Sequence, residues 1–98
     1  MENLKVKWYK RAQRHFDAIS AWYVSNMGLK AASHFAEDTR KTTEILSHFP
    51  LIGTIDRRYS TRKESYYSFL IHPKYRIIYR FTKTTLYIVA IRATMMNS

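Results

Sequence analysis

The sequence predicts an α+β domain in which a helical hairpin packs on one face of a mainly antiparallel sheet. In residues 12–49, apolar side chains recur at steps of three and four residues, which is typical of helices that bury one face. Residues 66–91 contain three runs rich in β-branched and aromatic residues with short polar breaks between them, and the central run alternates strictly between two sides, which is typical of antiparallel strands. A short alternating run precedes the helices, so the expected element order is β-α-α-β-β-β.

The first predicted elements are a short strand and a helix. Leu4, Val6 and Trp8 alternate with polar residues, which indicates a strand with a basic outer face. The spacing then becomes that of a helix, whose apolar stripe comprises Ala12, Phe16, Ile19, Tyr23 and Met27. Gly28 follows this stripe, at the position where a left-handed residue commonly ends a helix.

A second helix is predicted directly after this glycine. Its stripe has the same spacing and comprises Ala32, Phe35, Thr39, Thr42, Leu46 and Phe49. Pro50 then ends the helical pattern, because a proline inside a helix removes a backbone hydrogen bond. Two helices joined by so short a connection form an antiparallel hairpin, which we expect to cover the apolar face of the sheet.

The runs at residues 66–71, 75–81 and 86–91 predict a three-stranded antiparallel meander. One side of the central strand carries Tyr75, Ile77, Tyr79 and Phe81. The other side carries Arg76, Ile78 and Arg80. Since the apolar side faces the hairpin, we expect one core formed by Phe16, Ile19, Tyr23, Phe35, Leu46, Ile77, Tyr79 and Val89.

Length and charge set the broad class of protein. Residues 1–98 form a single domain, and the net charge of +10 with a pI near 10.1 favours an anionic or acidic partner. The charge is uneven, because residues 57–98 hold nine Lys or Arg against the single acid Glu64. Without cysteine, a signal peptide or a transmembrane-length apolar run, we expect a cytoplasmic protein with no membrane contact.

The candidate partner- or phosphate-binding residues lie in this second half and comprise five basic residues and one tyrosine. They are Arg76, Arg80, Tyr66, Lys63, Arg62 and Arg92. Tyr66, Ser68 and His72 share the arginine face if the alternation extends across the meander. His72 is a candidate for proton transfer, and its alternative interpretation is an exposed turn residue. The alternative for Arg76 is a surface arginine paired with Glu64.

No cofactor or metal is expected. His15, His34 and His48 have no metal-binding spacing, and the sequence contains no glycine-rich phosphate loop and no nucleophile elbow. A plain nucleic-acid-binding module fits the charge and the aromatic content, although no RNA- or DNA-binding signature is present.

Taken in order, these elements resemble the RelE/ParE superfamily, the toxins of bacterial type II toxin–antitoxin and plasmid-stabilisation modules. The resemblance covers nearly the whole chain. Its carriers are the first strand, the residues Ala12, Phe16, Asp17, Ile19, Tyr23, Gly28, Ala32 and Phe35, the turn at residues 49–53 and the strand at residues 75–79. The resemblance implies a cognate acidic antitoxin, which neutralises a toxin that inhibits growth.

Two modes of action exist within this superfamily. RelE-like members are ribosome-dependent endoribonucleases that cut mRNA with several cationic side chains. Here Arg76 matches their third-strand arginine, but Tyr67, Phe69 and Met95 occupy positions where cationic or proton-transfer groups are expected. ParE-like members poison DNA gyrase by protein contact and need no acid–base set. The sequence therefore favours a ParE-like toxin that is not an enzyme.

The alternative is a RelE-like endoribonuclease. Its catalytic candidates are Arg76, His72 and Arg62. Arg62, Lys63 or Arg92 would replace the missing cations if the loop or the last strand folds over the sheet. RNA cleavage of this kind requires groups that move protons and cations that stabilise the developing negative charge.

Overall fold

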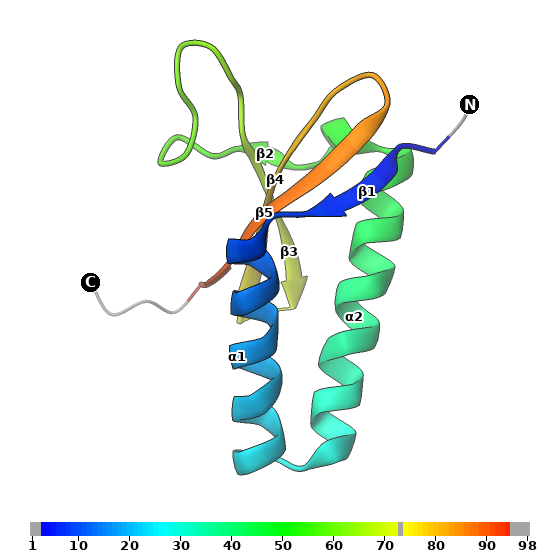
Figure 1. Cartoon of the computed structure of the whole chain (residues 1–98), viewed down its shortest axis with the longest axis vertical. Helices are drawn as coiled ribbons and strands as arrows, with labels where there is room; N and C mark the ends of the chain where they lie inside the picture. Colours follow the sequence, from blue (N-terminus) through cyan, green and yellow to red (C-terminus); the bar gives the residue numbers. More distant parts are fainter. Residues whose placement is uncertain (1–2, 73, 95–98) are drawn as a thin grey trace.

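The computed structural model describes residues 3–72 and 74–94, with only the backbone of His72 (Figure 1). The elements are β1 (Lys5–Trp8), α1 (Lys10–Asn26), α2 (Leu29–His48), the 3-10 turn η1 (Pro50–Ile52), β2 (Thr54–Ile55), β3 (Tyr67–His72), β4 (Tyr75–Phe81) and β5 (Thr85–Ala93). The predicted α+β architecture and order are confirmed. A turn was predicted at residues 49–53, but its 3-10 conformation and the two-residue strand β2 were not.

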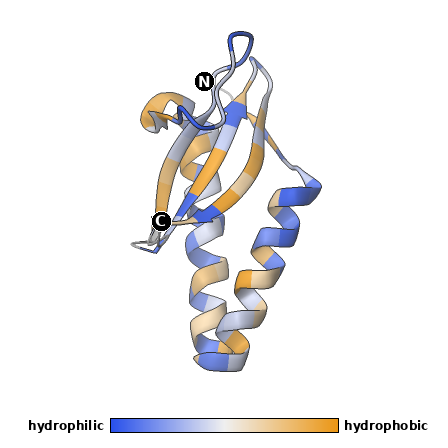
Figure 2. Cartoon of the chain, turned by 90° about the vertical axis from the view of Figure 1, so that its left-hand side faces the viewer, coloured by the Kyte–Doolittle hydropathy of each residue, from blue (hydrophilic) through white to orange (hydrophobic). Residues whose placement is uncertain are grey.

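The two helices run antiparallel and cover one face of the sheet (Figure 1). Orange and blue segments alternate along both helices in Figure 2, as expected for helices with one apolar face. Gly28 has a φ of +97°, which only glycine adopts easily, but its ψ of 168° is extended and not left-handed helical. Gly28 is therefore the N-cap residue of α2, and Met27 is the C-cap residue of α1. Neither described helix contains an apolar stretch that could cross a lipid bilayer.

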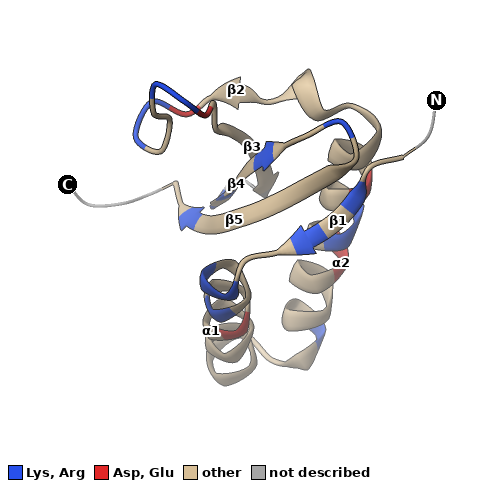
Figure 3. Ribbon diagram, turned by 45° about the horizontal axis from the view of Figure 1, so that its top comes forward, with Lys and Arg blue, Asp and Glu red and all other residues tan. Residues whose placement is uncertain are grey.

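The sheet has five strands in the order β1-β5-β4-β3-β2. β1 pairs in parallel with β5, and the other three pairs are antiparallel, as expected for a mainly antiparallel sheet. The first and last strands thus lie side by side, with Val6 opposite Leu86. β1 and β2 form the two opposite edges of the sheet (Figure 3).

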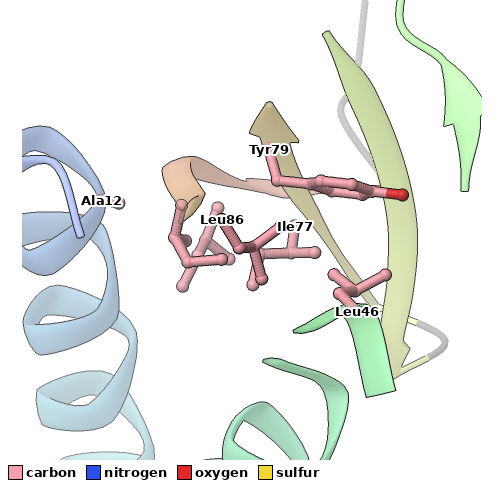
Figure 4. Packing of buried hydrophobic residues seen from close by; sticks show 7 residues of the cluster. Ala12, Leu46, Ile77, Tyr79 and Leu86 are labelled. Atoms are coloured by element: carbon pink, nitrogen blue, oxygen red, sulfur yellow. The ribbon is translucent and has the colours of Figure 1, made fainter. Parts of the chain in front are cut away.

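The main core lies between the hairpin and the sheet (Figure 4). Its buried members are Ala12, Leu46, Ile77, Tyr79, Leu86, Ile88 and Ile91. An aromatic layer continues the core along the hairpin, because Phe35 stacks on Phe16 at 5.4 Å and on Tyr23 at 5.5 Å between ring centroids. The same ring meets Tyr75 edge-on, so Phe35 joins both helices to β4.

The prediction that Val89 belongs to this core is wrong. Val89 lies on the opposite face, in a small buried cluster with Ile78 and Ala90. The strand alternation at Leu86 and Ile88 already places Val89 on that face. A β-bulge between β4 and β5 adds one residue there, so Ala90 also faces away from the helices.

Candidate functional site

The arginine face of the sheet is partly covered by the chain itself. Residues 56–66 form a loop that is anchored by Asp56, whose side chain is only 4% exposed. One oxygen of this carboxylate accepts the backbone N–H groups of Arg58 and Tyr59, and the other accepts from Arg92 of β5 at 3.1 Å. Residues 56–66 therefore cover part of the sheet face that lies opposite the helices.

The aromatic residues of the loop cover the middle of that face. Tyr59 and Tyr66 lie 6.3 Å apart between ring centroids, and both pack on the buried cluster of Ile78, Val89 and Ala90. The guanidinium of Arg11 lies 5.9 Å from the Tyr59 ring centroid, which connects the start of α1 to the loop. Burying these rings stabilises the conformation in which residues 56–66 pack on the sheet.

At one end of the arginine face, Arg76 and Arg92 lie directly opposite each other on β4 and β5. Like charges in this position repel. Asp56 compensates the charge of Arg92, and the Nε of Arg76 donates to the Ser68 hydroxyl at 3.2 Å. One guanidinium nitrogen of Arg92, Nη1, is buried without a hydrogen-bond partner among the described residues. Ser68 shares this face with Arg76, as predicted.

At the other end, Arg80 is held by aromatic residues and one carboxylate. Its Nε donates to the Tyr9 hydroxyl at 2.9 Å, and its guanidinium lies 4.1 Å from the centroid of the Tyr87 ring. The hydrogen bond to Tyr9 raises the pKa of Arg80 further above its usual value. Glu64 lies 3.8 Å from Arg80, so the alternative pairing of Glu64 with Arg76 is wrong.

Tyr66 belongs to the same end as Arg80. Its hydroxyl donates to Glu64 at 2.8 Å, and this hydrogen bond is the main reason why the pKa of Tyr66 is raised. Arg76 and Arg80 are four residues apart on one strand, which corresponds to roughly 13 Å. The predicted cations are therefore divided between two places.

The remaining candidate residues do not belong to the end of the face with Arg76 and Arg92, and only Lys63 lies near Arg80. Arg62 and Lys63 are exposed at the tip of the loop, where Figure 3 shows a concentration of basic residues. Lys63 and Arg80 line the same open hollow of about 390 Å³, together with Glu64, Ser65, Tyr67, Phe81 and Thr82. Arg62 does not line it. The side chain of His72 and the whole of Met95 lie outside the described part of the structure.

This arrangement is poorly suited to proton transfer. Arg80 and Arg92 are each paired with a carboxylate of the loop, and a tyrosine whose pKa is raised, such as Tyr66, is a poor base near neutral pH. Among the described residues, no three His, Asp or Glu side chains are grouped in a way that could hold a metal ion.

A second surface of interest is apolar and was not predicted as a site. It consists of the exposed large hydrophobic residues Ile45, Phe49, Leu51, Ile52 and Ile55, here called the apolar patch. His48, Phe49, Pro50, Leu51 and Ile52 also line an open hollow of about 530 Å³. In Figure 2 the turn after α2 is orange and stands at the side of the sheet.

Some of these features have a signal in the sequence and others have none. Asp56 precedes two arginines and begins a polar loop, a pattern in which aspartate often accepts nearby backbone N–H groups. The apolar patch is visible as a hydrophobic run around Pro50, at a place where no strand or helix is expected. The contact of Tyr9 with Arg80 joins residues 71 positions apart, and nothing in the sequence indicates it.

Comparison with known families identifies the class of protein. The family model described as "ParE toxin of type II toxin-antitoxin system, parDE" matches residues 6–97. The chain belongs to this ParE toxin family. The superfamily expected from the sequence is thereby confirmed.

Structural comparison supports the same fold for this ParE-family chain. A solved structure titled "Chromosomal ParDE TA system from P. aeruginosa" superposes with a TM-score of 0.69. The match has 20% sequence identity and covers 92% of this chain and 95% of that chain. A search among curated proteins found no significant match.

Proposed function

We propose that this ParE-family chain is the toxin of a type II toxin–antitoxin module and inhibits bacterial growth by contacting DNA gyrase. A cognate acidic antitoxin neutralises it. Family membership and the net charge of +10 support the module and an acidic partner. Gyrase and the ribosome are both cytoplasmic, so the toxin acts in the cytoplasm with either target.

The observation that favours protein contact over RNA cleavage is the engagement of the arginines within the chain. Arg92 is paired with Asp56, and Arg80 lies between Tyr9, Tyr87 and Glu64. A nuclease of the RelE type needs cations that are free to stabilise the developing negative charge, together with groups that move protons. A phosphate of RNA would have to displace Asp56 before it could pair with Arg92.

One observation favours the second candidate, a RelE-like ribosome-dependent endoribonuclease. Lys63 and Arg80 line a hollow of about 390 Å³ that also contains Glu64 and Tyr67. This hollow offers a cation and a carboxylate side by side without any movement of the loop. A phosphate bound there would lie between Lys63 and Arg80.

Two assays on the purified, antitoxin-free chain distinguish the targets. We expect inhibition of gyrase supercoiling with no cleavage of ribosome-bound mRNA. The variant Arg80→Ala tests the hollow, and Lys83→Ala, which removes an exposed cation from the turn between β4 and β5, is its matched control. Cleavage at the ribosomal A site that is lost in Arg80→Ala or Arg76→Ala, but kept in Lys83→Ala, would establish the endoribonuclease instead.

A growth assay tests the module itself. Expression of the chain alone should stop growth, and co-expression of the short acidic protein encoded beside it should restore growth. Growth that is unaffected by the folded, soluble chain would contradict a toxic role and leave only the fold of the family.

A further inference from the structure

The apolar patch is exposed to an unusual degree for side chains of this size. Phe49 is 63% exposed, Leu51 70% and Ile55 59%. Phe49, Leu51 and Ile52 line one open hollow, and Ile45 of α2 and Ile55 of β2 flank them in the chain. Contiguous exposed apolar surface on a small protein commonly marks an interaction site.

The backbone beneath the patch is held in one conformation. The Tyr79 hydroxyl donates to the Pro50 carbonyl at 2.6 Å and accepts the N–H of Gly53 at 3.1 Å. Tyr79 itself is fully buried in the core. The apolar side chains therefore stand on a rigid support, and a partner that binds them does not have to order this turn.

The patch continues into an edge of the sheet. β2 pairs with β3 on its inner side, where the Asp56 amide donates to the Tyr66 carbonyl at 2.7 Å. Because amides alternate in direction along a strand, the Ile55 amide points to the outer side, where the described residues place no further strand. An edge of this kind can pair with an extended segment of another chain.

The charges around the patch indicate what kind of segment fits. Arg57 and Arg58 follow β2 directly and are exposed, and Lys41 lies one helical turn before Ile45 on α2. A second copy of this chain would bring more of the same charge to the contact, on a protein whose net charge is already +10. The complementary partner is an acidic chain with a short apolar stretch.

We propose that the apolar patch and the outer side of β2 form the docking surface for an extended segment of the antitoxin. This segment adds a strand beside β2, places apolar side chains on Phe49, Leu51 and Ile55, and directs acidic residues toward Arg57 and Arg58. The identity of the partner rests on the proposed toxin–antitoxin function. The surface and the chemistry that it recognises rest on the residues above.

The first test uses a synthetic peptide of alternating valine and threonine with glutamates at both ends. Binding to the full chain is followed by nuclear magnetic resonance, with hydrogen exchange of the Ile55 amide as the direct sign of strand pairing. We expect binding that protects this amide. Replacing the glutamates by lysines, or one central valine by proline, should weaken binding at least about tenfold, since each change removes a required interaction.

Two variants of matched exposure test the patch. Leu51→Ser should weaken peptide binding at least about tenfold, whereas Leu29→Ser, at a leucine 73% exposed near the tip of the hairpin, should leave it unchanged. An absence of peptide binding, or equal binding to Leu51→Ser, overturns the proposal. A dimer in sedimentation that Leu51→Ser dissociates also overturns it, because a second copy would then cover the patch.

Growth assays connect the surface to the antitoxin. The adjoining acidic protein should relieve inhibition by wild type and by Leu29→Ser but fail to relieve inhibition by Leu51→Ser. Equal relief of all three places the antitoxin elsewhere and overturns the proposal. If the chain inhibits no growth at all, the proposed function fails, and the peptide experiment still decides whether the patch takes an acidic strand.

Discussion

The hydroxyl of Tyr79 donates a hydrogen bond to the backbone carbonyl of Pro50, 29 residues earlier in the chain. The same oxygen accepts the N–H of Gly53, so one side chain satisfies both ends of the turn η1. Burial raises the pKa of Tyr79 to about 12, which keeps the phenol protonated and able to donate. A side chain at position 53 would collide with this hydroxyl and with the Ser68 carbonyl, which explains the glycine.

Removing this hydroxyl should destabilise the protein and loosen the turn. Tyr79→Phe leaves the Pro50 carbonyl and the Gly53 amide without their partner. We expect a loss of about 1–2 kcal/mol in the free energy of unfolding, because both groups are partly accessible to water. Urea denaturation measures it. Tyr59→Phe is the control, with an expected change below about 0.5 kcal/mol; equal losses in the two variants would argue against a role for the Tyr79 hydrogen bonds.

The anchor of the loop at residues 56–66 can be tested at Asp56. Asp56→Ala removes the acceptor for two backbone amides and leaves Arg92, whose side chain is 22% exposed, without its carboxylate partner. We expect a loss of about 2–4 kcal/mol by urea denaturation, together with faster hydrogen exchange in the loop. Asp56→Asn keeps an acceptor oxygen and should lose less. Unchanged exchange in Asp56→Ala would mean that the aromatic contacts alone hold the loop.

The stability of the protein should depend on pH through His15. Its Nδ1 accepts the backbone N–H of Ile91, which lies on β5 beyond the end of β1. Burial, followed by the nearby charges of Arg11 and Arg14, lowers the pKa of His15 from its usual 6.5. The unfolded chain therefore binds this proton more readily than the folded one. The contribution of His15 to the free energy of unfolding is therefore fully present above about pH 6.5. It decreases as the pH falls from there toward the lowered pKa of the folded state.

Urea midpoints measured between about pH 5 and pH 7 check this expectation. The variant His15→Asn retains an acceptor near the same position but has no proton to gain, so its stability should vary less over this range. His34→Asn, at an exposed histidine of α2, should keep the dependence of the wild type. Identical pH profiles for wild type and His15→Asn would contradict a role for His15.

The aromatic layer gives a prediction for the hairpin. Phe35→Ala should lower the free energy of unfolding by roughly 3–5 kcal/mol, because Phe35 is buried and touches rings from α1 and β4. Phe49→Ala removes the same atoms from an exposed position and should change stability by less than about 0.5 kcal/mol. A loss below about 1 kcal/mol in Phe35→Ala would show that the layer contributes little to stability.

The fold could be predicted largely from the sequence, because periodicity is a local property. Steps of three and four residues identified both helices, and alternation placed Ile77 and Tyr79 on the side that faces them. Alternation alone would also have placed Val89 on the opposite face. The sequence could not show β2, since two residues cannot establish a period, or the bulge that places Ala90 beside Val89.

The candidate site could be predicted from the sequence only in part. Alternation predicted that Arg76 and Arg80 share a face, and composition predicted that this half of the chain is basic. Composition treats charges as if they were free, whereas the fold pairs Arg92 with Asp56, 36 residues away, and Arg80 with Tyr9, 71 residues away. Such pairs form because the parallel β1–β5 pairing and the closed loop bring distant segments together. Net charge and the general location of the arginines are determined by the sequence alone, but which arginines remain available to a partner is decided by the tertiary structure.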